Sequence, residues 1–364
     1  MHIVIDARII NSSTGRYVER LLHYLQEVDI TNRYTVLVPS KDLNYWQPTA
    51  ANFTVAVADF ANYSFGEQLG FKKLLDNLKP DLVHFCMPQQ PIQYKGANVT
   101  TFHDLTLLDT YNSDKNWAAF RIKQMVARFV FPLIAHKSRH IITPTKYVKD
   151  DVSKRLKVNP DKITFTHEAA DITPEAPKKY DHPFKKFILY VGQQSDYKNI
   201  KRLGDAHQKL LETHPDLGLI LVGSKNASAF KNETYFTERN YKNILFTGFI
   251  DDNQLAWLFQ HCEAYVFPSL MEGFGLPGLE AMAYGAPVVS SNATCLPEVY
   301  GMAAEYFDPL DVGDMTDAIS LVLDNPTRRQ ELIASGTEQV KKYSWRRMAE
   351  QTHEVYLSAL HRKK

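Results

Sequence analysis

The sequence predicts an α/β protein with two doubly wound domains, each built on a mostly parallel sheet. The chain has 364 residues, which is too long for one ordinary core and suits two domains of roughly 150 to 180 residues each. Short β-rich runs alternate with longer helical patterns, as in βαβ units. In residues 169–184, three prolines and several charges interrupt all periodicity, as expected where few contacts cross between domains.

In chain order, the first half alternates predicted strands with helical segments. The strands are expected at 2–5, 34–38, 53–57, 81–85, 98–102, 140–143 and 162–166. Helices are expected at 15–28, at 66–78 and within a long segment from 117 to 140. Each strand is a short run rich in β-branched and aromatic residues. The first domain is therefore predicted to span residues 1–170.

The second half restarts the same alternation after the proline-rich segment. Its strands are expected at 186–192, 218–223, 243–248, 263–269, 286–291 and 304–308. We therefore predict a linker over 171–184, a second domain over 185–345, and a terminal helix over 346–364 that packs back on the first domain.

Composition and charge narrow the class of protein. Hydrophobic residues make up 44% and charged residues 23%, and no apolar run reaches the roughly 20 residues of a membrane span. The N-terminus reads as a buried strand without the features of a secretion signal, so a cytoplasmic protein is expected. The net charge of +1 argues against nucleic acid as a partner. Cys86, Cys262 and Cys295 lack disulfide or zinc-ligand spacing.

The stretch EGFGLPGLE, from Glu272 to Glu280, combines two carboxylates with glycines before a predicted helix. Pro277 suits a first helical position, so Gly273 and Gly275 would lie in the preceding loop, where backbone amides attract phosphate. A carboxylate accepts hydrogen bonds from a sugar diol, so the stretch suits a sugar nucleotide. The alternative is that Glu280 only favours the helix N-terminus and Glu272 is an exposed loop residue.

The same stretch contains GFGLPG, which satisfies the dinucleotide fingerprint G-x-G-x-x-G. In that fingerprint a strand joins directly to a helix in a leading βαβ unit. Here several residues separate the motif from the preceding strand, deep in the second half. A dehydrogenase is therefore not favoured.

Further candidates follow predicted strands, at the sheet edge where α/β proteins bind ligands. Lys198 lies in the loop after the strand that ends at Gly192 and is a candidate phosphate cation, with a solvated surface lysine as the alternative. His103 and Asp104 follow the strand at 98–102, although a lone histidine is more often structural.

Gly15 and Arg16 begin the first predicted helix. The loop at Gly15 could bring a sugar or phosphate near backbone amides, and Arg16 is a candidate acceptor or phosphate contact. An exposed helix cation explains Arg16 almost equally well. For the DAR segment at 6–8, a structural ion pair and acceptor binding both stay open.

A basic amphipathic pattern lies in the long helical segment. Its apolar members fall at helical spacing: Ile122, Met125, Val126, Phe129, Val130, Leu133 and Ile134. Arg121, Lys123, Arg128, Lys137 and Arg139 lie elsewhere on the helix. Contact with anionic lipid at the inner face of the membrane is one interpretation. Core packing is the favoured one, with Pro132 bending the helix.

Residues 268–291, PSLMEGFGLPGLEAMAYGAPVVSS, resemble the signature of retaining glycosyltransferases of family 4, in which seven residues separate two glutamates. Other segments agree in order along nearly the whole chain: DAR with TGRYVERLL, TFHDL, ITPTKYVKDDV, YVGQQSDYKNIKRL, LVGS, FTGFIDDNQLAWLF and CLPEVYGMAAEYFDP. The resemblance implies the GT-B fold, with two Rossmann-like domains facing across a cleft, the donor on the second and the acceptor on the first.

The resemblance also implies roles for individual residues. Glu272 would contact hydroxyls of the transferred sugar, Glu280 the ribose, and His103 would lie beside the reacting sugar. The expected catalytic residues are His103, Lys198 and Glu272. Together with the loop at the first helix, Gly15, Arg16 and Asp104 are the expected acceptor residues. The implied donor site comprises Gly192, Gln193, Lys198, Gly223, Phe249, Ile250, Glu272, Gly273, Phe274, Gly275, Leu276 and Glu280.

One departure from the family pattern concerns the diphosphate. The family often has an arginine just before Lys198 or just after Gly192, and here Tyr197 and Gln193 occupy those positions. Neutralisation of the diphosphate would therefore depend on Lys198 and on helix amides.

The expected activity is transfer of a hexose, with mannose from GDP-mannose favoured, to a glycan or lipid-linked acceptor. The sequence contains no D-x-D motif, so a metal-independent reaction without a cofactor is expected. Retention of configuration follows from the resemblance alone. UDP- and dTDP-sugars stay open as donors. A nucleotide-sugar epimerase and a non-catalytic sugar-nucleotide-binding protein are the alternative functions.

Overall fold

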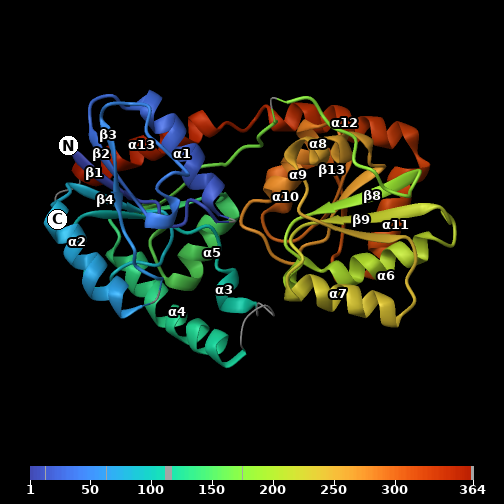
Figure 1. Cartoon of the computed structure of the whole chain (residues 1–364), viewed down its shortest axis with the longest axis horizontal. Coiled ribbons are helices and arrows are strands. Elements are labelled where there is room, and N and C mark those ends of the chain that lie inside the picture. The colour runs from blue at the N-terminus through green and yellow to red at the C-terminus, as the bar shows by residue number, and fades with distance from the viewer. Residues whose placement is uncertain (13, 63, 111–116, 174, 362–364) are drawn as a thin grey trace. The chain divides into compact units, whose positions relative to one another are not determined.

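The computed structural model describes residues 1–12, 14–62, 64–110, 117–173 and 175–361 (Figure 1). The chain divides into two compact units. The first unit contains residues 1–108, 124–168 and 344–364, and the second contains residues 109–123 and 169–343. The sequence contains no signal for the grouping of residues 109–110 and 117–123 with the second unit.

The first unit contains a seven-stranded parallel sheet in the order β3-β2-β1-β4-β5-β6-β7. Its strands are β1 (His2–Asp6), β2 (Arg33–Val38), β3 (Phe53–Val57), β4 (Leu82–Phe85), β5 (Asn98–Thr101), β6 (His140–Thr143) and β7 (Ile163–Phe165). The strands are mostly apolar because helices cover both faces of a parallel sheet. All seven strands expected from the sequence are present, and the predicted fold class is confirmed for this half.

Helices of the first unit follow the strands in βαβ order. They are α1 (Gly15–Val28), α2 (Lys72–Leu78), α3 (Thr106–Asp109), α4 (Trp117–Lys137), α5 (Lys146–Leu156) and α13 (Trp345–His361). The last residue of α3 and the first seven residues of α4 are grouped with the second unit. Short turns of helix lie at Ser40–Asp42, Glu67–Phe71 and Pro160–Lys162. The terminal helix α13 packs against α1 (Figure 1).

The second unit contains a six-stranded parallel sheet in the order β10-β9-β8-β11-β12-β13. Its strands are β8 (Lys186–Val191), β9 (Leu217–Val222), β10 (Ile244–Gly248), β11 (Ala264–Phe267), β12 (Val288–Ser291) and β13 (Ala304–Phe307). These match the six strands expected from the sequence. Each unit is a doubly wound, Rossmann-like domain, as predicted.

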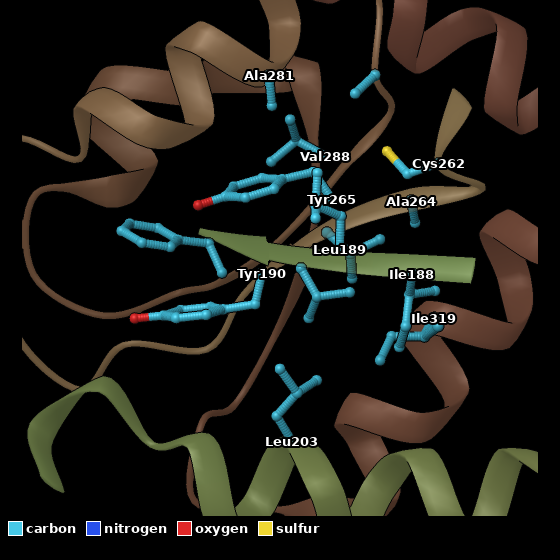
Figure 2. Packing of buried hydrophobic residues seen from close by; sticks show 14 of the residues in the cluster. Ile188, Leu189, Tyr190, Leu203, Cys262, Ala264, Tyr265, Ala281, Val288 and Ile319 are labelled. Carbon is cyan, nitrogen blue, oxygen red and sulfur yellow. The ribbon is translucent and has the colours of Figure 1, made fainter. Parts of the chain in front are cut away.

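Helices cover both faces of the second sheet. They are α6 (Ile200–Leu210), α7 (Ala227–Glu238), α8 (Asp252–His261), α9 (Leu276–Ala283), α10 (Leu296–Tyr300), α11 (Val312–Asp324) and α12 (Pro326–Val340), with short turns of helix at Asp196–Lys198 and Gly301–Ala303. Figure 2 shows Leu203 of α6 and Ala281 of α9 on opposite sides of β8. Ile188, Leu189 and Tyr190 of that strand are fully buried. The core of the unit therefore has two layers, one on each face of the sheet.

The segment expected as a linker is packed within the second unit. The backbone N–H of Thr173 donates to the Tyr284 hydroxyl at 2.8 Å, and that of Lys178 donates to the Asn253 carbonyl at 3.0 Å. Tyr180 packs against the core. These contacts satisfy backbone groups of a segment without secondary structure.

Each sheet has a topological switch point, where ligands of doubly wound proteins bind beyond the carboxyl ends of the strands. In the second unit the chain winds from β8 outward to β10 and then returns to β11 on the other side of β8. The loops after β8 and β11 are therefore neighbours at the switch point. The same reversal occurs in the first unit between β1 and β4.

The helix α4 corrects one expectation. The sequence favoured core packing for its apolar residues, but exposed fractions are 72% for Phe129, 59% for Ile122 and 56% for Leu133. Met125 and Val126 are also exposed, Val130 is half-buried, and of the seven only Ile134 is fully buried. The core is contacted instead by the opposite face, which includes Ala127 and Phe131. That prediction was wrong because helical periodicity does not say which face meets the core.

Candidate functional site

The loop after β8 brings Lys198 to the switch point of the second unit. Gly192 follows the strand with φ +144°, and its N–H donates to the Val222 carbonyl at 2.9 Å. The Tyr190 hydroxyl donates to the Gln193 carbonyl at 2.5 Å, which anchors the loop to the core. Lys198 ends a short turn of helix immediately before α6. The loop is therefore held at both ends.

The loop after β11 carries the glutamate and glycine stretch. Gly275 adopts φ +98°, and a Cβ there would lie 2.6 Å from the Tyr300 hydroxyl oxygen, so both conformation and space require glycine. The Tyr300 hydroxyl donates to the Gly275 carbonyl at 2.6 Å. The helix α9 then begins at Leu276 with Pro277 next, one residue earlier than the proline suggested. The first backbone N–H groups of such a helix have no intrahelical acceptor.

These two loops meet through a short ion pair. The Lys198 Nζ lies 2.5 Å from Glu272 Oε1, and the side chains are 13% and 12% exposed. The sequence suggested both residues for the donor site, with Lys198 on the diphosphate and Glu272 on the sugar. It did not predict that they would bind each other across 74 positions.

The electrostatics of this pair favour the charged state. Burial by itself disfavours the ammonium, but the Glu272 carboxylate outweighs it and raises the pKa of Lys198 above its ordinary value. The ammonium also lies over the Tyr197 and Phe267 rings, at 5.1 and 5.6 Å from their centroids. The backbone N–H of Glu272 donates to the Thr294 hydroxyl at 3.1 Å. The backbone at Glu272 is thus held by Thr294, and its carboxylate by Lys198.

Glu280 lies in the second turn of α9 and is half-buried. Gly273 and Phe274, which precede the helix, are buried, and the Phe274 side chain packs in the core of the unit. Any ligand contact from Phe274 would therefore be made by its backbone, as the resemblance implies.

The remaining donor candidates follow β9 and β10. Gly223 has φ +155°, and a Cβ there would lie 2.1 Å from the Gly192 carbonyl oxygen, so two strand ends touch through bare backbone. Phe249 follows β10 and is 86% exposed, whereas Ile250 packs against the core. The candidates Gly192, Gly223 and Phe249 therefore lie along one edge of the sheet.

In the first unit, His103 follows β5 and its ring is held on three sides. Its Nε2 lies 3.0 Å from the Cys86 carbonyl oxygen, which can only accept, so Nε2 carries the proton of this bond. Its Nδ1 lies 3.6 Å from Glu168 Oε1. The Tyr17 ring contacts the imidazole edge-on, with centroids 4.8 Å apart. Sequence reasoning missed Glu168 and Tyr17, and nothing in their local pattern marks them.

The acceptor candidates have visible structural roles. Asp104 accepts the backbone N–H of Thr106 at 2.8 Å, which stabilises the turn before α3. The N–H of Gly15 donates to the Ser12 carbonyl at 2.9 Å, and a Cβ at Gly15 would lie 1.9 Å from the Ile10 carbonyl oxygen. Arg16 is exposed in the first turn of α1.

The structure describes no helix that is both long and apolar enough to span a bilayer. Among the described side chains, no group of three or more His, Cys, Asp or Glu is arranged to hold a metal ion.

Two family profiles match the chain. "Glycosyltransferase Family 4" matches residues 14–173, and "Glycosyl transferases group 1" matches residues 173–339. The O-antigen chain mannosyltransferase B of Escherichia coli is 32% identical over 272 residues, which cover 71% of this chain and 69% of the relative. The serotype-specific mannosyltransferase WbdA of Escherichia coli is 29% identical over 74% of this chain, which spans only 36% of that longer relative.

Solved structures share the fold. The sucrose-phosphate synthase of Thermosynechococcus elongatus superposes with a TM-score of 0.79 at 18% identity, covering 98% of both chains. The Anabaena protein HepE, in complex with UDP and glucose, superposes with a TM-score of 0.73 at 15% identity, covering 98% of this chain and 100% of that one. With its matched profiles, its relatives and its two parallel-sheet domains, the chain belongs to the group 1 glycosyltransferases of family 4, with the GT-B fold.

Proposed function

We propose that this glycosyltransferase moves a hexose from a nucleotide-diphosphate sugar to a glycan or lipid-linked acceptor, with mannose from GDP-mannose as the favoured donor. Two of its relatives in Escherichia coli are named mannosyltransferases, which supports the sugar. The observation that carries the proposal is the ion pair between Lys198 and Glu272, placed between the loops after β8 and β11. A cation and a carboxylate at this position suit the two parts of a sugar nucleotide.

Donor binding would exchange the partners of this ion pair. The diphosphate would attract the Lys198 ammonium and the first backbone amides of α9. Glu272 would then accept hydrogen bonds from hydroxyls of the sugar, and Glu280 from the ribose. Before the donor binds, Lys198 and Glu272 neutralise each other, so neither half-buried charge is left unpaired. The ion pair thus holds the Lys198 ammonium at the loop without the free-energy penalty of an unpaired buried charge.

We propose that transfer proceeds with retention and without a metal. The acceptor oxygen would attack the anomeric carbon from the same face that the phosphate leaves. Its bond to that carbon would form as the bond between the carbon and the phosphate oxygen breaks. The departing phosphate oxygen takes the acceptor proton. Lys198 and the α9 amides would stabilise the charge that develops on the diphosphate, since fixed dipoles need no reorganisation. In the first unit, His103 is a candidate to bind a sugar hydroxyl through its Nδ1, which lies 3.6 Å from Glu168 Oε1.

The first experiment identifies the base of the donor. Thermal unfolding is followed with GDP, UDP, dTDP or ADP added, because a ligand that binds only the folded protein stabilises it by mass action. GDP is expected to raise the midpoint most. A larger shift with UDP or dTDP would overturn the GDP-mannose assignment while leaving the glycosyltransferase itself intact.

The second experiment separates the alternative functions. GDP-mannose is incubated with and without a mannose-containing glycan, and both product and free GDP are followed. Transfer that requires the glycan and persists with a chelator present is the expected result. Conversion of the donor without acceptor would indicate an epimerase, and binding without turnover would indicate a non-catalytic protein.

A further inference from the structure

The helix α4 exposes a continuous apolar stripe. Ile122, Met125, Val126, Phe129 and Leu133 recur at the three- and four-residue spacing of one helix face, and each is at least 41% exposed. Its opposite face, with Ala127 and Phe131, is buried in the core of the first unit. Single exposed apolar side chains are ordinary, but a stripe of five on one helix indicates a binding surface.

Positive charge surrounds this stripe. The sequence of α4 contains no aspartate or glutamate over its 21 residues. On a helix of 3.6 residues per turn, Arg121 and Arg128 lie along one side of the stripe and Lys123 along the other. All three are exposed. An apolar face bordered by cations matches helices that lie in a membrane interface.

The stripe leads to a basic cavity at the C-terminal end of α4. Lys137 is four residues beyond Leu133 and so shares its face, and it lines a cavity of about 1040 Å³. The cavity lies between α2, the segment before β5 and the end of α4. Its charged lining consists of Lys72, Lys79, Lys95, Lys137 and Arg139 against Asp76.

The cations of this cavity are only partly neutralised within the described chain. Lys72 pairs with Asp76 at 2.6 Å. Lys137 donates to the carbonyl oxygens of Pro91 and Ile92, at 3.1 and 2.9 Å. Burial lowers the pKa of Lys137 to about 8, so its surroundings do not favour the charge that it carries at neutral pH. An anion in the cavity would stabilise that charge.

We propose that α4 docks on an anionic lipid bilayer, with its apolar stripe among the acyl chains and the basic cavity around the phosphate of an anionic headgroup. This surface is separate from the donor site and does not rest on the proposed reaction. A second copy of the chain fits the surface less well, because a symmetric contact would bring the same cations face to face. A bilayer of anionic lipid supplies the opposite charge along the whole helix.

Vesicle co-sedimentation tests the occupant. The full chain is mixed with vesicles of phosphatidylcholine alone, or of equal parts phosphatidylcholine and phosphatidylglycerol. It is expected to sediment with the second and not the first, and to be released as salt is raised. Equal sedimentation with both vesicles would overturn the role of the cations, and sedimentation with neither would overturn the proposal.

Point variants test the surface. Phe129→Ser and Leu133→Ser are expected to weaken partitioning onto the anionic vesicles about tenfold each, since each removes an apolar side chain from the bilayer. Phe230→Ser is the matched control, because Phe230 is 56% exposed on α7 of the second unit. Partitioning unchanged by the two α4 variants, or lost equally in the control, contradicts the proposal.

A charge variant tests the cavity by itself. Lys95→Gln is expected to weaken partitioning about fivefold, as one cation near an anionic surface contributes about 1 kcal/mol. Lys186→Gln, at the exposed start of β8, serves as its control and is expected to change nothing. Light scattering accompanies each measurement. A dimer that Phe129→Ser dissociates, together with no vesicle binding, would assign the stripe to a second copy instead.

Discussion

The switch points of the two sheets each carry a cation beside carboxylates, but their coordination differs. At the end of β1, the Arg8 guanidinium bonds Asp6 twice at 2.8 Å and lies 3.0 Å from Glu67. It also donates to the carbonyls of Phe60 and Gln89, and it stacks over the Phe71 ring. At the end of β8, Lys198 pairs with the single carboxylate of Glu272. At the first edge, protein groups bind the cation on several sides, whereas at the second a single carboxylate does, and we propose that a donor diphosphate replaces it.

The chemistry of the two cations explains this difference. A guanidinium has five donors in a rigid fork, and at Arg8 protein acceptors on several sides engage them. An ammonium is a compact charge on a flexible stem, so Lys198 can turn from a carboxylate to a phosphate. The sequence left two interpretations open for the DAR segment at 6–8, a structural ion pair and acceptor binding. The contacts of Arg8 favour the structural ion pair. Lys198, the cation that we propose for the donor diphosphate, lies in the second unit.

We expect the greatest loss of stability when the Arg8 network at the end of β1 is disrupted. Arg8→Met leaves Asp6 and Glu67 buried without their cation, which should lower the stability of the first unit by about 3 to 5 kcal/mol. Urea unfolding followed by fluorescence measures the loss. GDP affinity of the folded protein should stay unchanged, because the residues that we propose for donor binding lie in the second unit. A stable variant with weakened nucleotide binding would instead give Arg8 a role in ligand binding.

The second prediction concerns the ion pair between Lys198 and Glu272. Lys198→Ala and Glu272→Gln should each lower kcat about hundredfold. In the proposed reaction, the first removes the charge opposite the leaving diphosphate, and the second removes the carboxylate that binds sugar hydroxyls. Steady-state transfer with saturating donor is the measurement. Lys201→Ala, an exposed lysine of α6, is the matched control. Full activity in both site variants would show that the ion pair is only structural.

A third prediction concerns Gly275, the glycine that precedes α9, where we expect a smaller loss of stability. Gly275→Ala should lower stability by about 1 to 3 kcal/mol and weaken donor binding, because its Cβ would collide with Tyr300 and Leu296. Gly285→Ala has a similar positive φ of +81° but nothing within 4 Å of its Cβ. It should cost about 1 kcal/mol through the backbone alone. Equal losses in both variants would exclude a role for the Tyr300 contact.

The smallest effect concerns pH and occurs in both units. Burial, together with the charge of His103, lowers the pKa of His84 from 6.5 to about 3, and burial lowers the pKa of His207 to about 4. The unfolded chain therefore binds more protons than the folded one between these values and about 6.5, so stability should fall as pH drops through that window. Urea unfolding from pH 7 to pH 5 measures the slope. His84→Gln should flatten it for the first unit, and an unchanged slope would assign the effect to other groups.

The strands were predictable because each is a short apolar run whose burial on both faces follows from its composition. The glutamate and glycine stretch was predictable as well, since Gly275 and Pro277 mark the start of α9 by backbone chemistry alone. The grouping of residues 109–110 and 117–123 with the second unit was not predictable, because no compositional change marks it. Nor was the exposed stripe of α4, since an amphipathic pattern is the same whichever face meets the core.

The sequence was enough to indicate two parallel sheets, the loops at their carboxyl edges and the candidate residues for binding phosphates and sugars. Those follow from local propensity and from the spacing of residues along the chain. Only the tertiary structure decided that Lys198 binds Glu272, that Glu168 lies behind His103, and that Arg8 is closed off by Glu67. Each of these pairs joins residues that are distant in the chain, and only the folded backbone brings such charges within a few ångströms.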